Sequence, residues 1–376
     1  MILSEDILAL KQMVAEIVDK KVIPTAEECD KTGRFPEELY QELIEMGLGC
    51  VYMPEQFGGP GLSKLAAAAI QEELARGDMG VSCTLAATCL ASLSVLIAGT
   101  EEQQAHWFKT MTETTNFAAF CLTEPGAGSD SAAVRTTAIR DGDDYIINGS
   151  KCFISNGGVA GIYTVLASTD RSLGTKGLTA FIVERDREGI TIGKEEDKMG
   201  MRLSNTTDVV FDSVRIPAKN RLGKEGGGFK IVMKTLDASR PTIGAQGVGI
   251  AQRALDEAVK YAKERVQFNK PIAAFQAIQF ALADIAIELE TTRQMTYHAC
   301  DLIDRGLPYT KEAAIVKGKA GEMIVNVTNK ALQIFGGYGY MRDYPMEKLV
   351  RDGRILGIYE GTTEVQKMVI AGSLLN

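Results

Sequence analysis

The sequence predicts an α+β fold in which helices occupy both ends of the chain and the strands are gathered in the middle. Two observations lead to this prediction. Apolar residues recur at helical spacing from the N-terminus to about residue 115, and again from Gly226 onward. Between about residues 116 and 225 they occur instead in short runs separated by turn residues. We therefore expect three domains, over residues 1–115, 116–225 and 226–376.

The N-terminal part is predicted to be helical because its segments carry recognisable helix starts. Ser4 can cap the first helix, and Pro36 opens a second, since proline suits the first helical turn. Ser63 can cap the alanine-rich helix that follows a glycine-rich loop. The nearly uncharged stretch 81–100 predicts a helix that is buried in the protein.

Four short runs of strand-forming residues mark the middle part. They begin at Tyr145, Ile162, Leu178 and Thr207, and the first follows a turn rich in Asp and Gly. Short strands with turns between them are typical of a small sandwich or barrel.

Three long helical segments are expected in the C-terminal part, at about 231–262, 278–303 and 313–334. Pro241 lies within the first and has no amide hydrogen, so the carbonyl of Asp237 loses its helical partner. Asp237 and Arg240 are three residues apart and share a face of this helix. A kink with a surface ion pair is the alternative interpretation.

The composition argues against several classes of protein. The 376 residues contain 41 Lys and Arg and 49 Asp and Glu, so the net charge is −8. This acidic balance argues against nucleic-acid binding, which normally requires a basic surface. We expect charge or glycine to interrupt every long apolar run within about a dozen residues, which argues against a membrane span. No signal peptide is visible, so we expect a cytoplasmic protein.

The cysteines and histidines do not suggest a metal site. Seven cysteines are scattered along the chain without a CxxC pair, and His106 and His298 are far apart in the sequence. We therefore expect neither a disulfide framework nor a bound metal.

A segment rich in glycine and hydroxyl residues, 121–130, lies where the first helical part gives way to strands. Gly126 and Gly128 allow backbone amides to approach a ligand closely, and Thr123 and Ser129 add hydroxyl groups. The spacing fits neither a Walker A loop nor a dinucleotide fingerprint. An ordinary surface turn is an equally good interpretation.

The segment 151–157 follows a strand and places Phe153 two residues before Ser155. An aromatic face with a nearby hydroxyl suits a flat heterocycle. A strand end followed by a turn is the alternative interpretation.

Two segments near the C-terminus combine aromatic residues with groups that can bind or react. Residues 333–340 end a helix in glycine and place aromatic rings near exposed backbone amides. Residues 358–364 put Glu360 in an apolar and aromatic setting before the last helix. Desolvation there would raise the pKa of Glu360 and suit it to act as a base near neutral pH. Stabilisation of the helix dipole is the alternative role.

Taken in order, six motifs resemble those of the acyl-CoA dehydrogenase flavoproteins. They are Thr-Glu-Pro-Gly-Ala-Gly-Ser-Asp (123–130), Asn-Gly-Ser-Lys-x-Phe-Ile-Ser-Asn-Gly (148–157), Glu-Arg-Val-Gln-Phe (264–268), Phe-Gln-x-x-Gln (275–279), Gln-x-x-Gly-Gly-Tyr-Gly-Tyr (333–340) and Ile-Tyr-Glu-Gly-Thr (358–362). The resemblance covers essentially the whole chain. It implies an N-terminal helical domain, a middle β-barrel or sandwich domain and a C-terminal four-helix bundle.

The resemblance also implies a cofactor, FAD, and a set of binding residues. Those matching FAD contacts are Cys121, Leu122, Thr123, Phe153, Ser155, Arg265, Phe268, Gln276, Gln333, Gly336, Gly337, Thr362 and Glu364. Those matching substrate contacts are Ser129, Asp237, Arg240, Tyr359 and Gly361. Phe153 stands where the family usually has Trp, and Ser155 where it often has Thr. Both departures keep the aromatic ring or the hydroxyl.

The reaction implied by the resemblance is the α,β-dehydrogenation of an acyl-CoA thioester. Glu360 is implied to remove the α-proton while the β-hydrogen leaves as hydride to flavin N5. The backbone N–H of Glu360 and a ribityl hydroxyl of FAD are implied to stabilise the thioester oxygen. Some relatives carry the base on the long helix near Asp237, but Ala238 and Ser239 stand there in this chain. The family shares FAD between subunits, which implies a homotetramer built as a dimer of dimers, and electron-transferring flavoprotein is the implied electron acceptor.

Three other functions are compatible with the same motifs: an enoyl-CoA reductase running the reverse reaction, an acyl-CoA oxidase, and a non-catalytic FAD-binding assembly factor. The acyl group is expected to be uncharged, short to medium in length, and straight or alicyclic, with butyryl as the default. In the family the acyl chain runs along the helix matching residues 81–100, which contain no charge here. A carboxylate buried there without a partner would cost several kcal/mol.

Overall fold

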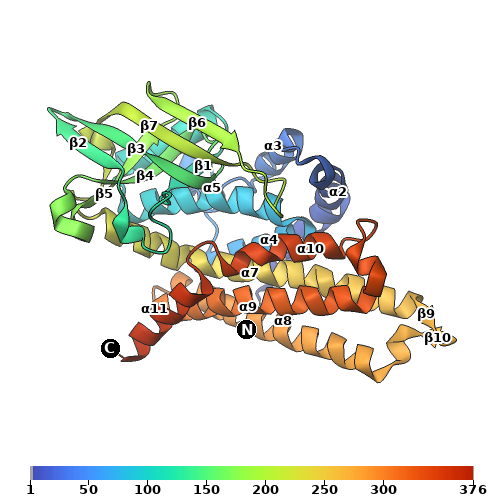
Figure 1. Cartoon of the computed structure of the whole chain (residues 1–376). Helices are drawn as coiled ribbons and strands as arrows, with labels where there is room; N and C mark the ends of the chain where they lie inside the picture. The colour runs from blue at the N-terminus through green and yellow to red at the C-terminus, as the bar shows by residue number, and fades with distance from the viewer. Residues whose placement is uncertain (1–2, 376) are drawn as a thin grey trace.

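A computed structural model describes residues 3–375 (Figure 1). The helices that precede the sheet are α1 (Glu5–Ile17), α2 (Ile23–Thr32), α3 (Glu37–Glu45), α4 (Lys64–Gly77), α5 (Met79–Ala98) and α6 (Glu101–Glu113). Two predicted caps are confirmed, because Ser4 Oγ accepts from the amide of Ile7 and Ser63 Oγ from that of Ala66, at 3.4 and 3.2 Å. Pro36 directly precedes α3, also as predicted.

The middle strands form one mixed sheet. They are β1 (Ala118–Cys121), β2 (Thr137–Asp141), β3 (Asp144–Ser155), β4 (Ile162–Ser168), β5 (Leu178–Glu184), β6 (Ile190–Glu195), β7 (Thr206–Pro217) and β8 (Arg221–Leu222). Their order is β6-β7-β3-β2-β4-β5-β8, and β1 pairs with β4 in parallel, with Ala118 opposite Ile162. The four predicted runs correspond to β3, β4, β5 and β7, whereas β1, β2, β6 and β8 were not predicted.

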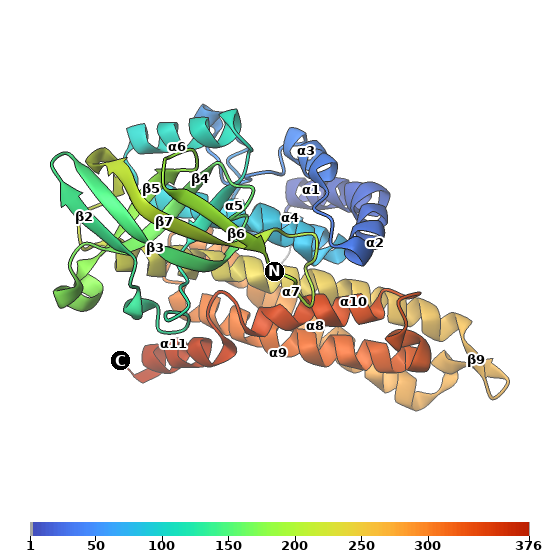
Figure 2. The same cartoon turned by 45° about the horizontal axis from the view of Figure 1, so that its top comes forward.

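The C-terminal part is a bundle of long helices, as predicted. Its elements are α7 (Gly228–Glu264), a hairpin of β9 (Val266–Gln267) and β10 (Lys270–Pro271), α8 (Gln276–Asp304), α9 (Thr310–Phe335), α10 (Met346–Gly353) and α11 (Thr363–Leu375). α7, α8 and α9 lie side by side, and the hairpin forms the end of the bundle away from the sheet (Figures 1 and 2). α7 continues through Pro241 without a break. At Gly244 a Cβ would come within 2.3 Å of Val316, so only glycine allows α7 and α9 to approach so closely.

Helix α5 corrects one expectation. Among the described residues it is the one helix long and apolar enough to cross a membrane, with 20 residues and a mean hydropathy of 2.0 over its best window. The expectation that charge or glycine interrupts every long apolar run is therefore wrong. Of that window, 72% is buried inside the protein, and α5 packs on α4, α7 and β1. Its composition is explained by burial on nearly all sides.

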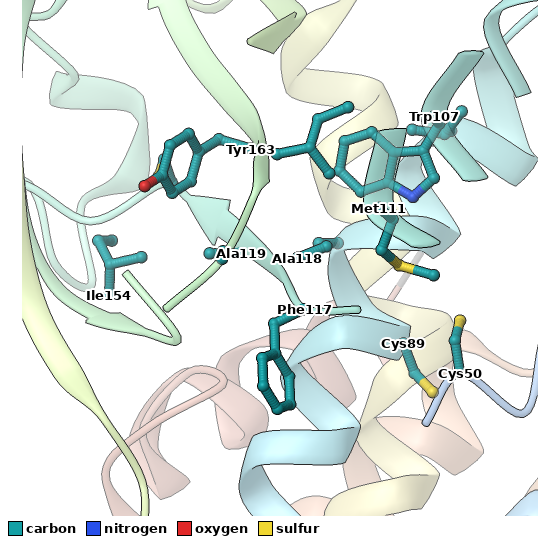
Figure 3. Close-up of a cluster of buried hydrophobic side chains, with 14 of the residues drawn as sticks. Cys50, Cys89, Trp107, Met111, Phe117, Ala118, Ala119, Ile154 and Tyr163 are labelled. Carbon is teal, nitrogen blue, oxygen red and sulfur yellow. The ribbon is translucent and has the colours of Figure 1, made fainter. Parts of the chain in front are cut away.

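A buried cluster joins the first helices to the sheet (Figure 3). Trp107 of α6 is fully buried, and its indole N–H donates to Ser92 Oγ of α5 at 3.0 Å. Met111 and Ala118 belong to the same cluster. The start of β1 is thereby fixed against α5, which positions the loop that follows β1.

Candidate active site

Glu360 lies in the loop before α11. Its backbone is left-handed, with φ of 56°, and Gly361 follows with φ of 85°. The side chain is partly buried, and Ser239 of α7 donates its hydroxyl hydrogen to Glu360 Oε2 at 2.8 Å. Burial raises the pKa of Glu360, although the Ser239 hydrogen bond and the charges of Arg240 and Lys317 act in the opposite direction. The net direction is the one that the sequence predicts.

The residues around Glu360 are held by side chains from three helices. The Tyr359 hydroxyl donates to Gln246 Oε1 of α7 at 2.7 Å. The carbonyl of Gly361 accepts from Gln366 Nε2 of α11 at 3.0 Å and from the ammonium of Lys317 of α9. The base is therefore placed by contacts of its loop with the bundle.

The predicted pair of Asp237 and Arg240 forms on α7. Arg240 Nη1 lies 2.5 Å from Asp237 Oδ1, and Thr310 Oγ1 donates to Asp237 Oδ2 at 2.9 Å. The alternative of a surface ion pair is wrong, since the Arg240 side chain is only 4% exposed. Its Nε is buried and has no hydrogen-bond partner among residues 3–375. A buried donor left unmatched within the chain is suited to a bound polar group.

Phe153 turns out of the sheet at a bulge. The register of β3 against β7 shifts between Lys151 and Ile154, and Phe153 has φ of 56°. Its ring is 66% exposed, which is unusual for an aromatic residue in a strand. Ser155, with its hydroxyl, ends β3 two residues later.

The loop after β1 is tied to this bulge. Lys151 Nζ donates to the carbonyl of Leu122 at 3.1 Å and to Glu124 Oε1 at 2.8 Å. The amide of Cys152 donates to the carbonyl of Thr123 at 2.9 Å. Cys121 itself is buried, so its side chain faces the interior, whereas Ser129 is exposed.

Cys83 of α5 connects the strand end with the base. Burial raises the pKa of the Cys83 thiol to about 11; the nearby Ser155 hydroxyl acts to lower it, and the negative charge of Glu360 acts to raise it. Ser155 and Glu360, 205 residues apart in sequence, therefore lie around one side chain. Cys83, Ser239 and Lys317 were not predicted as site residues, because a lone cysteine, serine or lysine in a helix carries no motif. We call this region the centre; it comprises Phe153, Ser155, Ser239, Arg240 and Glu360.

A second group of predicted residues lies at the other end of the bundle. Arg265 ends α7, with its guanidinium carbon 5.4 Å from the ring centroid of Tyr338. Phe268 of the hairpin is 87% exposed. A cavity of about 480 Å³ is lined by residues that include Arg265, Gln267, Gly336 and Gly337. We call this region the hairpin end. Gln276, the first residue of α8, and Gln333, in the last turn of α9, are exposed.

The two regions are far apart. Ser239 and Arg265 are 26 residues apart along α7, a separation of about 39 Å at the ordinary helical rise. The chain thus brings the predicted residues together in two groups rather than one. Thr362 and Glu364 belong with the centre, where Thr362 Oγ1 accepts from the amide of Val365 at 3.3 Å.

A carboxylate of raised pKa that accepts a hydrogen bond from a hydroxyl suits proton abstraction, and an exposed aromatic ring such as that of Phe153 suits a flat cofactor. Family models for the acyl-CoA dehydrogenase N-terminal, middle and C-terminal domains match residues 4–115, 119–214 and 226–375. The chain belongs to the acyl-CoA dehydrogenase family. It is therefore an oxidoreductase, and the cofactor of its family is FAD.

Relatives cover nearly the whole chain. A short-chain specific acyl-CoA dehydrogenase from Megasphaera elsdenii is 47% identical over 95% of this chain and 94% of its own length. An acryloyl-CoA reductase (NADH) from Anaerotignum propionicum is 44% identical over 97% of this chain and 93% of its own length. The structure of butyryl-CoA dehydrogenase from M. elsdenii matches with a TM-score of 0.97 at 44% identity, covering all of both chains. A structure from work on the electron transferring flavoprotein of Acidaminococcus fermentans also matches with a TM-score of 0.97 at 44% identity. The match covers 100% of this chain and 99% of the other.

The described residues fit FAD. At the centre, the exposed ring of Phe153 and the hydroxyls of Thr123 and Ser155 offer a flat face and donors. At the hairpin end, Arg265 offers a guanidinium, and a Cβ added at Gly336 or Gly337 would meet nothing within 4 Å, which leaves open space beside this part of the backbone.

Proposed function

We propose that the chain catalyses the α,β-dehydrogenation of a short- to medium-chain acyl-CoA, and that Glu360 takes the α-proton. The observation that carries this proposal is the carboxylate of raised pKa, held by Ser239 in the same region as Ser155 and Cys83. When bound, FAD supplies the acceptor for the β-hydrogen. The chain's own task is to orient the thioester, remove the proton and exclude water.

The residues of the centre divide this task. The backbone N–H of Glu360 is proposed to donate to the thioester oxygen, where charge develops as the α-proton leaves. Arg240, with its unmatched buried Nε, Asp237 and the exposed Ser129 are proposed to hold the CoA part. Tyr359 and Gly361 flank the base and are proposed to line the substrate side.

FAD is proposed to be shared between two chains. Ser239 at the centre and Arg265 at the hairpin end are about 39 Å apart along α7, and we infer that these two regions of one chain serve two different FAD molecules. The bundle also exposes Phe268, Phe280, Ile287 and Tyr340 to a degree that suits burial against other copies. We infer a homotetramer, a dimer of dimers, in the cytoplasm. A colourless purified protein, or a stable monomer that keeps its flavin in light scattering, would contradict this.

The direct test of the mechanism is Glu360→Gln. Turnover should fall by several orders of magnitude, because an amide cannot accept the proton, while binding of FAD and acyl-CoA is largely kept. Stopped-flow reduction of the flavin by butyryl-CoA under anaerobic conditions measures this step. Glu322→Gln, an exposed carboxylate paired with Lys367, is the matched control and should react normally. Residual activity of E360Q above a few per cent would sink the assignment.

The acyl group is the second point to test. We expect kcat/KM to be highest for butyryl-CoA or another uncharged substrate in a panel with hexanoyl-, isobutyryl-, cyclohexanecarboxyl- and glutaryl-CoA. Glutaryl-CoA should be at least about 100-fold poorer, since α5 offers its carboxylate no charged partner. Lys64 Nζ is buried without a hydrogen-bond partner, 3.5 Å from the ring centroid of Tyr52. If glutaryl-CoA is the best substrate and Lys64→Met abolishes that preference, the charge comes from Lys64 and the argument from α5 is wrong.

A second candidate function is the reverse reaction, reduction of an enoyl-CoA. It is favoured by the acryloyl-CoA reductase among the relatives. The match to the structure described under the electron transferring flavoprotein supports such a protein as the redox partner in either direction. The test compares the rates at which electron-transferring flavoprotein, NADH and oxygen exchange electrons with the reduced or oxidised enzyme. These rates separate a dehydrogenase from a reductase and from an oxidase. An assembly factor would show no turnover with any of them.

A further inference from the structure

Lys317 of α9 is a fully buried lysine that faces the loop of Glu360. Burial of an ammonium group costs free energy unless other groups compensate it. Within the described residues, the hydrogen bond that Lys317 donates goes to a carbonyl oxygen, that of Gly361, and not to a carboxylate. A buried cation with this partner calls for a reason beyond stability.

The loop that Lys317 contacts needs support. Glu360 adopts a left-handed backbone, which is strained for a non-glycine residue, and Gly361 is left-handed as well. Two donors hold the carbonyls of these residues. Gln366 Nε2 reaches the oxygens of Glu360 and Gly361 at 3.3 and 3.0 Å, and the Lys317 ammonium adds a charge-assisted bond to Gly361.

The charges around Glu360 distinguish Lys317 from its neighbours. The groups that act on or lie near the carboxylate are Ser239, Arg240 and Asp237 of α7, Lys317 of α9, Cys83 of α5, Glu364 of α11 and Tyr359 of the same loop. The charge of Arg240 is shared with Asp237 at 2.5 Å. Lys317 makes no ion pair within 4 Å among the described residues, so its charge is not shared with a carboxylate as that of Arg240 is, although Arg240 acts more strongly on Glu360.

We propose that Lys317 is a positioning residue that holds the Glu360 loop in its reactive conformation and keeps the carboxylate ionised. This inference rests on the proposed function, in which Glu360 is the base. Burial lowers the pKa of Lys317 to about 8, so the ammonium is mostly protonated at neutral pH. Its positive charge opposes the effect of burial on the pKa of Glu360.

The test compares Lys317→Met, Lys317→Arg and Gln366→Met in the FAD-loaded enzyme. Without the Lys317 charge the pKa of Glu360 rises, so the acid limb of kcat should move up by about one pH unit in K317M, a tenfold loss below the limb. The value of kcat at the optimum should fall about tenfold, with KM nearly unchanged. K317R keeps the charge, so the acid limb of its kcat profile should stay at the pH found for the unchanged enzyme. Q366M removes a neutral donor and should lower kcat without moving the limb.

pH-difference infrared spectroscopy of the FAD-loaded protein without acyl-CoA measures the protonation of Glu360 without turnover. The band of the protonated Glu360 carboxyl is identified by its absence in Glu360→Gln, and its titration should shift upward in K317M. Lys319→Met, on the same helix but paired with Glu288, is the control and should shift neither the band nor the limb.

The outcomes separate two failures. A folded K317M with normal FAD content, an unmoved limb and an unmoved band overturns the role of Lys317. An active E360Q overturns the proposed function instead. If K317M does not fold, Lys317→Gln keeps a donor to Gly361 without the charge, and its limb must still move for the proposal to hold.

Discussion

The centre and the hairpin end differ in how far a single chain completes them. At the centre, Arg240 is almost fully buried, Glu360 is hydrogen-bonded to Ser239, and three helices hold the surrounding loop. At the hairpin end, Phe268 is 87% exposed, and the cavity beside Arg265 is lined by the ends of α7 and α9 and by the short segments that follow them. Reactive groups require fixed geometry, whereas binding groups can be completed by a partner. In the proposed function, the centre serves the chemistry and the hairpin end serves binding and assembly.

The largest effect is expected from the pair that supports the centre. Lys151 and Glu124 lie 2.8 Å apart and are 0% and 6% exposed. Lys151→Met leaves the Glu124 carboxylate buried and unpaired, which should lower the free energy of unfolding in urea by about 3–5 kcal/mol. The exposed pair of Lys367 and Glu322 is the control, and Lys367→Met should cost about 0–1 kcal/mol. Equal losses in both variants would show that the centre is no more rigid than the surface.

The next effect tests the hairpin end. Arg265→Ala should weaken FAD binding about 100-fold, because a charge-assisted donor to an anionic ligand contributes about 1.5–3 kcal/mol. Fluorescence of released flavin measures the Kd, and light scattering reports the assembly. Lys270→Ala in the same hairpin removes a charge that lies over Phe275 and should change the Kd little. An R265A enzyme that binds FAD normally would remove the hairpin end from the cofactor site.

The smallest effect is expected at Phe153. Stacking against an aromatic ring contributes about 0.5–1.5 kcal/mol, so Phe153→Ala should weaken FAD binding only about 2- to 10-fold. Phe153→Trp should restore the affinity. The same titration used for R265A makes the comparison direct. A larger loss in F153A than in R265A would reverse the division of labour between the two regions.

Much of the fold was predictable because its signals are local. The caps at Ser4 and Ser63 depend on residues within one turn. The helical spacing of apolar residues in α7, α8 and α9 is visible in the sequence. β1, β2 and β6 were missed for a different reason. The short strand Ala118–Cys121 gains its conformation from pairing with β4 and from packing on α5, and neither contact has a local signature.

The candidate site was likewise predictable only where its residues lie in local motifs. Glu360, Arg240 and Phe153 lie in motifs, so their importance could be inferred before their positions were known. Cys83, Ser239 and Lys317 could not be found, because each acts through a neighbour more than 40 residues away in sequence. The helix predicted at 81–100 forms as α5, but the expected interruption by charge or glycine was wrong, since the one glycine of α5 is its second residue and none of its residues is charged.

Helix α7 connects both regions without a break over 37 residues, and this places a constraint on chain length. Inserting or deleting one residue between Ser239 and Arg265 would turn Arg265 by about 100° and shift it by about 1.5 Å. In the proposed assembly each chain presents Ser239 and Arg265 to two different sites, so the number of residues between them in α7 should be fixed. Changes of length in related chains should therefore fall in open turns such as those at Gly142 and Gly174, where nothing lies within 4 Å of an added Cβ.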